Sequence, residues 1–191
     1  MQEEKAKLRK QALKLRDGIP PETRIEKSLA AAEHGAANLD FVPGTIVSGF
    51  FPIRSEIDPR PLMDELRKSG AVLCLPVVVD KTTIIFRELI RGAELVDTGF
   101  GTRGPIETAT VLDPELLIMP LSVFDQYGGR VGYGAGHYDR AIAKLINKGL
   151  TPCLIGMGFD CQQIQRVPIE LHDQPLNGMI TETGYYPARD N

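Results

Sequence analysis

The sequence predicts an α/β protein, a three-layer sandwich whose mainly parallel central sheet is flanked by helices. Short, wholly apolar runs typical of buried parallel strands recur along the chain. Segments with helical spacing of apolar residues alternate with them. The 191 residues suffice for one domain with a sizeable core. We therefore expect a single domain over 1–191, with N-terminal helices over 3–39 and an α/β core over 44–182.

Four helices are expected, over residues 5–16, about 22–39, 59–68 and 138–147. The first places Leu8, Ala12 and Leu15 on one face. Prolines introduce the second, and Gly70 and Gly149 end the last two. Strands are expected over 45–51, 71–79, 83–89, 116–120, 153–159 and 179–181. Ligands bind beyond the carboxyl ends of parallel strands, which directs attention to the loops after Phe51, Pro120 and Phe159.

Composition narrows the class of protein. The formal net charge of -3 argues against a general nucleic-acid binder. No signal-type stretch and no run near the ~20 apolar residues of a membrane span is present in the sequence. Three widely spaced cysteines predict neither a disulfide framework nor a zinc site. We expect a cytoplasmic, monomeric enzyme that acts on small molecules, with no nucleic-acid or membrane partner.

A glycine-rich loop precedes the last predicted helix. Glycines 132, 134 and 136 remove every second side chain, so backbone N–H groups can approach an anion closely. The positive end of the following helix faces the same place. Arg130 and Arg140 flank the loop and can neutralise phosphate charge. The spacing matches neither the dinucleotide nor the Walker motif, and Asp139 by itself is explained as a helix N-cap.

The longer string that contains this loop is far more specific. The chain reads LIMP at 117–120, FD at 124–125 and GRVGYGAGHYDR at 129–140, which resembles the hallmark of the 5-formyltetrahydrofolate cyclo-ligase family. Three further segments resemble that family in the same order: KAKLR at 5–9, FFP and SEID within 50–58, and HDQPL at 172–176. The resemblance implies an ATP- and magnesium-dependent ligase that converts 5-formyltetrahydrofolate to 5,10-methenyltetrahydrofolate, with release of ADP and phosphate.

The resemblance also implies roles for residues. Lys5 and Arg9, at i and i+4 on one helical face, would hold ATP phosphates. Asp139 and Asp173 would bind Mg²⁺, which needs few carboxylates when it bridges phosphates. The remaining cations of the first helix, Lys7, Lys10, Lys14 and Arg16, are expected to be solvated. The rest of the implied ATP site is Arg130 and the loop residues Val131, Gly132, Tyr133, Gly134, Ala135, Gly136, His137 and Tyr138.

On the folate side, the resemblance implicates Phe51, Glu56 and Tyr138. A carboxylate suits the N–H donors of a pterin, and a tyrosine suits the boundary between an aromatic ring and a phosphate. Arg130 and Tyr138 are the expected catalytic residues, acting by positioning and electrostatic stabilisation. Asp58 is expected to cap the following helix, whereas Glu56 has no evident structural duty.

Some positions depart from the family pattern. Tyr133 and Ala135 stand where some relatives carry arginine and lysine, and His137 replaces a frequent tyrosine. Asn177 stands where bacterial relatives often have aspartate. The positive charge that Tyr133 and Ala135 do not provide would then come from elsewhere, with Arg103 as the candidate.

Two alternatives share the predicted architecture. A non-catalytic sugar-phosphate sensor would carry a DNA-binding helix-turn-helix, which this acidic sequence lacks. A sugar-phosphate isomerase would need an acid–base pair around a sugar. It would not explain the cations at 5 and 9 together with the carboxylates at 139 and 173.

Overall fold

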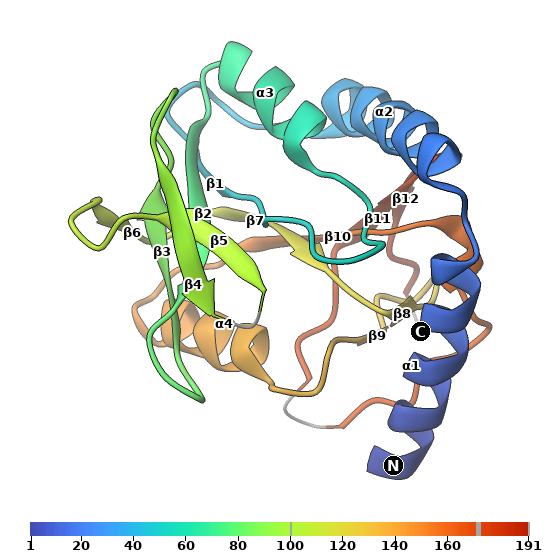
Figure 1. The fold of residues 1–191 in the computed structure, drawn as a ribbon. Helices are drawn as coiled ribbons and strands as arrows, with labels where there is room; N and C mark the ends of the chain where they lie inside the picture. Colours follow the sequence, from blue (N-terminus) through green and yellow to red (C-terminus); the bar gives the residue numbers. More distant parts are fainter. Residues whose placement is uncertain (100, 171–172, 191) are drawn as a thin grey trace.

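The structure is a computed structural model that describes residues 1–99, 101–170 and 173–190. Its main sheet has eight strands, in the order β12-β11-β10-β7-β1-β2-β3-β6 (Figure 1). The central strands from β11 to β2 are parallel, and β12, β3 and β6 join antiparallel at the two edges. The strands are β1 (Ile46–Ser48), β2 (Val72–Val78), β3 (Ile84–Glu88), β6 (Val111–Leu112), β7 (Leu116–Pro120), β10 (Cys153–Met157), β11 (Gly178–Thr181) and β12 (Gly184–Pro187).

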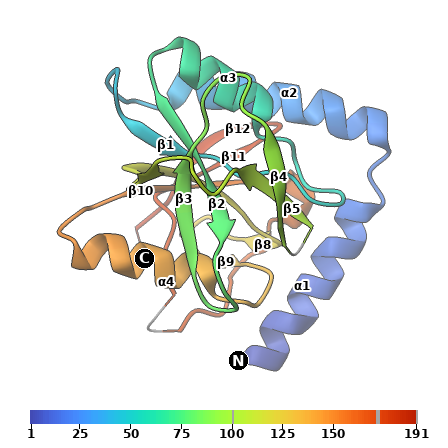
Figure 2. The same ribbon diagram turned by 60° about the vertical axis from the view of Figure 1, so that its left-hand side comes forward.

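Four helices accompany the sheet: α1 (Gln2–Asp17), α2 (Pro21–Asn38), α3 (Arg60–Lys68) and α4 (His137–Asn147). Figures 1 and 2 show α2 and α3 on one face of the sheet, α4 on the other, and α1 along the side of the molecule. The expected three-layer α/β sandwich is confirmed, and the helix bounds agree within a few residues. The first strand is shorter than expected, because its partners β2 and β7 pair only with 46–48.

Two apolar cores lie on the two faces of the sheet. On one face, Ala31 of α2 and Leu62 of α3 pack with strand residues such as Val47, Ile118 and Ile155. On the other, the buried stripe of α4 packs against Leu117, Met119 and Leu154. Strand residues such as Leu117 and Ile118 alternate between the two cores, which is why this strand is apolar throughout.

Several short elements lay outside the sequence expectation. The chain between β3 and β6 forms an antiparallel hairpin of β4 (Leu95–Gly99) and β5 (Thr102–Pro105). A second small pair joins β8 (Val123–Phe124) to β9 (Arg130–Val131), and η1 (Asp160–Gln162) follows β10. Strand β12 extends the sheet beyond residue 182, where the sequence placed the end of the core. His172, part of the C-terminal family motif, lies outside the described residues.

The buried face of α1 differs from the expectation. Leu15 is 60% exposed, whereas Arg16 is only 1% exposed. The helix packs through Leu8 and Ala12 against a small cluster that includes Val123 and Val131. The prediction that Arg16 is solvated was therefore wrong, while Lys7, Lys10 and Lys14 are exposed as expected.

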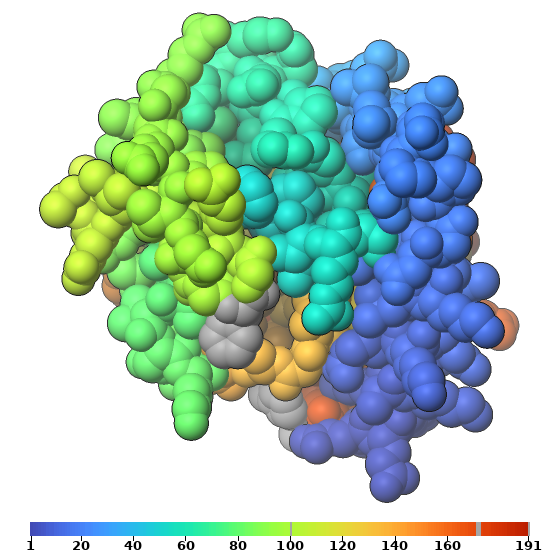
Figure 3. Space-filling model, in the orientation of Figure 1, coloured from blue at the N-terminus to red at the C-terminus, as the bar shows by residue number. Residues whose placement is uncertain are grey.

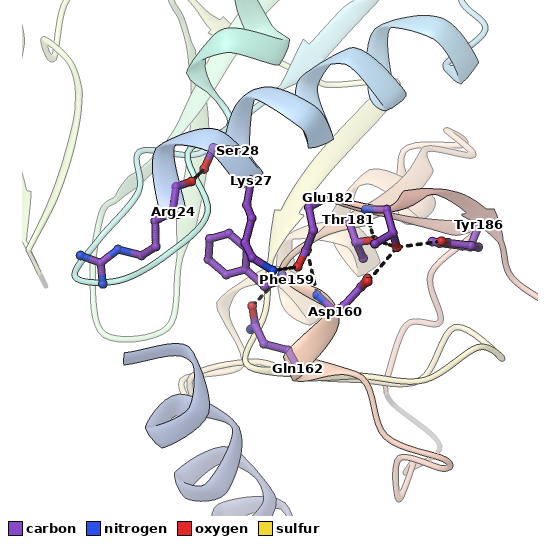
Figure 4. Close-up of polar contacts among 10 residues, drawn as sticks. Arg24, Lys27, Ser28, Phe159, Asp160, Gln162, Thr181, Glu182 and Tyr186 are labelled. Atoms are coloured by element: carbon purple, nitrogen blue, oxygen red, sulfur yellow. Dashed lines mark hydrogen bonds and ion pairs between the residues drawn. The ribbon is translucent and has the colours of Figure 1, made fainter. Parts of the chain in front are cut away.

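A polar network joins α2 to the loops at the end of the sheet (Figure 4). The Glu182 carboxylate forms an ion pair with the Lys27 ammonium and accepts a hydrogen bond from the backbone N–H of Asp160 at 2.9 Å. Thr183 donates to the Asp160 carboxylate and contacts the Tyr186 hydroxyl. These contacts fix η1 and the β11–β12 turn relative to α2. Among the described residues, none of the helices combines the length and apolar character that a membrane crossing needs.

Candidate active site

Two cavities lie side by side at the carboxyl ends of the parallel strands. The first, of about 340 Å³, is lined mainly by apolar side chains such as Phe51, Ile53, Val78 and Ile84, and we call it the apolar cavity. It opens on the face of Figure 3, hollowed between the β4–β5 hairpin (yellow-green), the loop after β1 (cyan) and α1 (blue). The loops after β1 and β7 contribute to it as predicted. Phe159 itself is fully buried in the core, and the chain that follows it lines the second cavity through Glu170 and Asp173.

The second cavity, of about 350 Å³, lies between α1, the glycine loop and the residues Glu170 and Asp173. We call it the polar cavity, because charged groups such as Lys5, Arg9 and Asp173 line it. Arg130, Gly136 and Asp139 line both cavities. A molecule in one cavity can therefore meet a molecule in the other at these three residues.

The glycine loop forms the wall between the cavities. Gly134 has φ +99°, and Gly136, the N-cap of α4, has φ +65°, both in the left-handed region that favours glycine. A Cβ at Gly136 would lie 2.8 Å from Arg140 Nη1. Gly132, Gly134 and Gly136 line the polar cavity at the N-terminal end of α4. Backbone N–H groups and the helix dipole there favour an anion, as the sequence predicted.

Helix α1 contributes two cations to the polar cavity. Arg9 Nε donates to the carbonyl of Gly132 at 2.7 Å, which leaves the rest of its guanidinium beside Gly134. Lys5 Nζ pairs with both Glu170 and Asp173. Burial works against its charge, but the two carboxylates outweigh burial and raise the pKa of Lys5 above its usual value. Lys5 and Arg9 lie on one face of α1 and line the same cavity, as their spacing predicted.

Carboxylates face these cations. Asp139 Oδ1 accepts from Arg130 Nη2 at 2.6 Å and from the N–H of Gln174 at 3.3 Å. Asp139 lies in the first turn of α4, whose N-cap is Gly136, so its interpretation as an N-cap was wrong. Asp139, Asp173 and Glu170 line one cavity, although no group of three or more metal-binding side chains is closely gathered in the described part of the chain. The arrangement fits a cation that arrives bound to a phosphate ligand and takes one or two protein carboxylates.

Three residues that line the apolar cavity carry a buried polar atom without a hydrogen bond in the described part of the chain. Three buried atoms of its lining residues, Glu56 Oε1, Arg130 Nε and Tyr138 Oη, make no hydrogen bond to any described residue. Buried polar groups are rarely left unsatisfied. Burial, with the charge of Glu56 second, raises the pKa of Tyr138 above its usual range, so its hydroxyl remains a hydrogen-bond donor. Together these atoms are one acceptor and two donors that belong to residues of the cavity wall.

Glu56 is positioned by the turn that contains it. Its Oε2 accepts from the N–H of Ile53 at 2.8 Å, and its own N–H donates to the Ile53 carbonyl. Arg54 within this turn has φ +53°, a strained value for a side chain of its size. Glu56 caps no helix, as expected, but it has a role in this turn: one oxygen accepts from the Ile53 N–H, and the other is buried without a hydrogen bond to any described residue. Asp58 Oδ1 accepts from the backbone N–H of Arg60 at 3.0 Å, across Pro59, so it caps the N-terminal end of α3 as expected.

The loop residues divide between the two cavities. Tyr133, Ala135, His137 and Tyr138 line the apolar cavity, while Val131, Gly132 and Gly134 line the polar one. Arg103 also lines the apolar cavity, so it lies away from the phosphate-like site to which the sequence assigned it. Asn177 has a structural position, because its amide oxygen accepts from the N–H of Leu154 at 2.7 Å.

Sequence reasoning missed one residue next to the site. Arg16 Nη1 donates to the Tyr133 hydroxyl at 2.6 Å, and Arg16 Nε donates to Ser55 Oγ at 3.0 Å. Residues 5, 9, 12 and 16 recur at helical spacing, so the face that carries Lys5 and Arg9 continues to Arg16. That periodicity was the available signal.

Comparisons with known proteins point to a single family. The model of the 5-formyltetrahydrofolate cyclo-ligase family matches residues 1–182. The Escherichia coli K12 5-formyltetrahydrofolate cyclo-ligase is 30% identical over 172 residues, covering 87% of this chain and 93% of the relative. The Mycolicibacterium smegmatis enzyme of the same name is 29% identical and covers 93% of both chains. The solved structure of Aquifex aeolicus 5,10-methenyltetrahydrofolate synthetase has a TM-score of 0.76 at 28% identity, covering 98% of this chain and 94% of that one.

Proposed function

Because this chain belongs to the 5-formyltetrahydrofolate cyclo-ligase family, we propose that its apolar cavity binds the folate and its polar cavity binds the phosphates of ATP. The observation that carries the proposal is the junction of the two cavities at Arg130, Gly136 and Asp139. Family membership decides against the sensor and isomerase alternatives. The protein is an ATP-dependent ligase that closes the formyl group of 5-formyltetrahydrofolate into the five-membered ring of the methenyl product.

The chemistry explains why two adjoining sites are needed. A formamide is a poor electrophile, and its oxygen is a poor leaving group. Transfer of the γ-phosphoryl group to the formyl oxygen turns that oxygen into a phosphate leaving group. The folate N10 then attacks the same carbon, and phosphate departs as the ring closes. No covalent enzyme intermediate is required, so catalysis rests on positioning and charge stabilisation.

On the nucleotide side, Lys5, Arg9 and Arg130 would bind phosphate oxygens. The backbone of residues 131–138 would bind them as well, at the start of α4. The support is a line of cations and left-handed glycines around one cavity. Since Tyr133, Ala135 and His137 direct their side chains to the apolar cavity, their contribution to the nucleotide would come from the backbone.

A magnesium ion would be held between the phosphates and the carboxylates of Asp139 and Asp173. When bound, the ion neutralises phosphate charge and orients the transferring group. The carboxylates are already engaged by cations of the protein, Asp139 by Arg130 and Asp173 by Lys5. Those pairs hold both side chains at the cavity wall, where few protein ligands suffice for a nucleotide-borne ion.

On the folate side, Glu56 Oε1 would accept hydrogen bonds from the pterin, against the face of Phe51. The guanidinium of Arg60 lies over the outer side of the Phe51 ring, 5.6 Å from its centroid. Arg130 and Tyr138 would act at the junction, where their unpartnered Nε and Oη can donate to the formyl oxygen as it takes up negative charge.

We also propose a monomer without nucleic-acid partners, because one chain supplies the lining of both cavities and carries a formal net charge of -3. The free thiols of Cys74, Cys153 and Cys161 fit a reducing compartment, and the cytoplasm is our proposed location.

The decisive experiment mixes purified protein, 5-formyltetrahydrofolate and Mg·ATP and follows the near-ultraviolet absorbance of the methenyl product. We expect absorbance to rise only when all components are present. Binding of each substrate alone to Glu56→Gln then tests the assignment of the cavities. Weaker folate binding with normal ATP binding supports it, whereas equal weakening of both ligands contradicts it.

A further inference from the structure

Arg16 is a buried charge that the substrate sites described above do not use. Its side chain, in the last turn of α1, is only 1% exposed. Nε donates to Ser55 Oγ at 3.0 Å, and Ser55 in turn donates to the Asp17 carboxylate. Nη1 donates to the Tyr133 hydroxyl oxygen at 2.6 Å, and the guanidinium carbon lies 5.9 Å from the centroid of the Tyr133 ring.

This arrangement is costly if it serves only to pack α1. Within the described ranges, no carboxylate lies close enough to form an ion pair with Arg16. Removing a guanidinium from water without a direct counter-ion costs several kcal/mol. A leucine or methionine would fill the same position beside Ala12 without that penalty. Packing alone therefore does not explain a guanidinium at this position. The Arg16 guanidinium contacts Tyr133, in the loop that lines the apolar cavity.

The hydrogen bond from Arg16 limits where the Tyr133 hydroxyl can direct its own proton. A tyrosine hydroxyl has one proton to donate and also accepts. Because Arg16 Nη1 donates to the oxygen, the hydroxyl proton must point elsewhere. Both Tyr133 and Glu56 line the apolar cavity, and Glu56 Oε1 is buried without a hydrogen-bond partner among the described residues. The Glu56 carboxylate lies near enough to interact with the Tyr133 hydroxyl, so the proton that Arg16 turns away from itself can point to Glu56.

We propose that Arg16 is a positioning residue for the folate: it orients the Tyr133 hydroxyl, and together they hold the Glu56 carboxylate as an anion that faces the pterin. The inference rests on the proposed folate-binding role of Glu56. In this inference Arg16 of α1 contacts neither substrate, yet it controls how well the Glu56 carboxylate accepts hydrogen bonds from the folate.

The electrostatic surroundings of Glu56 agree with this role. Burial raises the pKa of the Glu56 carboxyl, and the Tyr133 hydroxyl, the Ile53 N–H and the charge of Arg16 oppose that rise. Arg54, in the same turn, also lowers the pKa. The Glu56 charge is in turn felt by Tyr138 of α4. The other ionisable groups that line the cavity are Arg103 of β5, Arg130 of β9, and His137 and Asp139 of α4. Arg16 and the Tyr133 hydroxyl both lower the pKa of Glu56. Without either group that pKa should be higher, so Glu56 should stay protonated up to a higher pH.

The test compares Arg16→Met, Arg16→Lys, Tyr133→Phe and Glu56→Gln with the wild type. Lys14→Met, an exposed cation two residues before Arg16, is the matched control. The dissociation constant of 5-formyltetrahydrofolate is measured without ATP from pH 5.5 to 9, and that of ATP without folate. Thermal melting verifies that each variant is folded.

We expect Tyr133→Phe and Arg16→Met to weaken folate binding at least about tenfold at pH 7, the loss of one charge-assisted hydrogen bond. In both variants the acidic limb of the pH profile should move to higher pH, while ATP binding stays within twofold of wild type. Arg16→Lys should recover part of the shift, because it restores a positive charge. Glu56→Gln should abolish the acidic limb, and Lys14→Met should leave every curve unchanged.

The outcomes separate the inference from its premise. If Glu56→Gln binds folate normally, the proposed role of Glu56 fails. If Glu56→Gln loses affinity but the acidic limb stays in place in Arg16→Met and Tyr133→Phe, the inference about Arg16 fails alone. Equal weakening at every pH would mean that Arg16 only supports the fold. Should Arg16→Met not fold, Tyr133→Phe decides, because it deletes one oxygen and keeps the ring.

Discussion

Arg130 Nη2 lies 2.6 Å from Asp139 Oδ1 at the point where the two cavities meet. Arg130 comes from β9 and Asp139 from the first turn of α4, so the pair spans the glycine loop from one end to the other. The Arg130 side chain is only 5% exposed, and its Nε has no partner among the residues described. A guanidinium held in this way can contact phosphate and formyl oxygens without first reorganising.

Arg130→Lys tests this preorganisation. Lysine keeps the charge but loses the planar fork that can bind Asp139 and a substrate oxygen together. We expect kcat to fall by about 10²–10³, as for loss of a donor to a developing oxyanion, with smaller changes in KM for either substrate. Initial rates of methenyl formation measure this, with melting curves as the control for folding. A rise in KM at normal kcat would contradict the prediction, because it would assign Arg130 to ground-state binding.

Arg9→Ala should reduce ATP affinity by about 1.5–3 kcal/mol, or roughly 10- to 150-fold, because a charged donor to phosphate is lost. Stability should fall by only about 1 kcal/mol through the hydrogen bond to Gly132, since alanine favours the helix. Titration of ATP measures the effect, and Lys10→Ala, an exposed neighbour, is the control. Wild-type ATP affinity in Arg9→Ala would remove Arg9 from the nucleotide site.

Much of the fold could be predicted from the sequence, because its periodic segments are long. Apolar residues at helical spacing mark α4, and an unbroken apolar run marks the strand at 116–120. Both elements lie where the sequence predicted them. The strands β6, β8 and β9 have two residues each, too few to show any period. The β4–β5 hairpin has Gly99 and Gly101 within it, which indicated a loop to sequence reasoning.

The site was predictable where one motif carries it and not where distant segments meet. The glycine loop and the Lys5/Arg9 pair are local patterns that spacing revealed, and the family resemblance implied that they share one site, as they do in the polar cavity. The burial of Arg16 depends on Ser55 and Tyr133, which lie far away in the sequence. No local pattern reports such a contact. The same holds for Asp173, whose pairing with Lys5 joins the two ends of the chain.

Asp173→Asn should weaken the binding of Mg²⁺ that turnover requires. The apparent Mg²⁺ requirement should rise at least about tenfold, the size seen even for loss of an outer-sphere partner. Folate affinity, measured without ATP, should not change. Glu170→Gln is the matched control, because Glu170 is the other carboxylate that binds Lys5. An equal effect in both variants would mean that Asp173 acts only by holding Lys5.

Lys27→Met tests the network that fixes α2 to the end of the sheet. The Glu182 side chain is only 8% exposed. Without Lys27, its buried carboxylate would be left with one uncharged hydrogen-bond donor, the N–H of Asp160. Lys27 is itself 34% exposed, which limits the loss to about 1–2 kcal/mol of stability. Denaturant unfolding measures the loss. Lys68→Met, which breaks the exposed pair with Glu65, should change stability by less than about 0.5 kcal/mol.

Glu56→Gln should stabilise the free protein at neutral pH while it weakens folate binding. Burial raises the pKa of Glu56 above its ordinary value of 4.5, so the folded protein binds this proton more tightly than the unfolded chain does. The stability that Glu56 contributes is therefore complete below that ordinary value and is lost as pH rises through the folded-state pKa. Glutamine does not titrate, keeps an oxygen for the Ile53 N–H, and avoids the cost of a buried charge.

The melting temperature of Glu56→Gln relative to wild type should thus increase from pH 4.5 to pH 7.5, the direction set by the raised pKa. Folate binding should weaken by about 2–4 kcal/mol at neutral pH, because pterin donors would face an amide donor instead of a carboxylate. Melting curves and folate titrations of the same preparations measure both effects. A difference in melting temperature that does not change with pH would show that Glu56 carries no buried charge. Unchanged folate affinity would show that the pterin lies elsewhere, so the two measurements test the electrostatics and the substrate site independently.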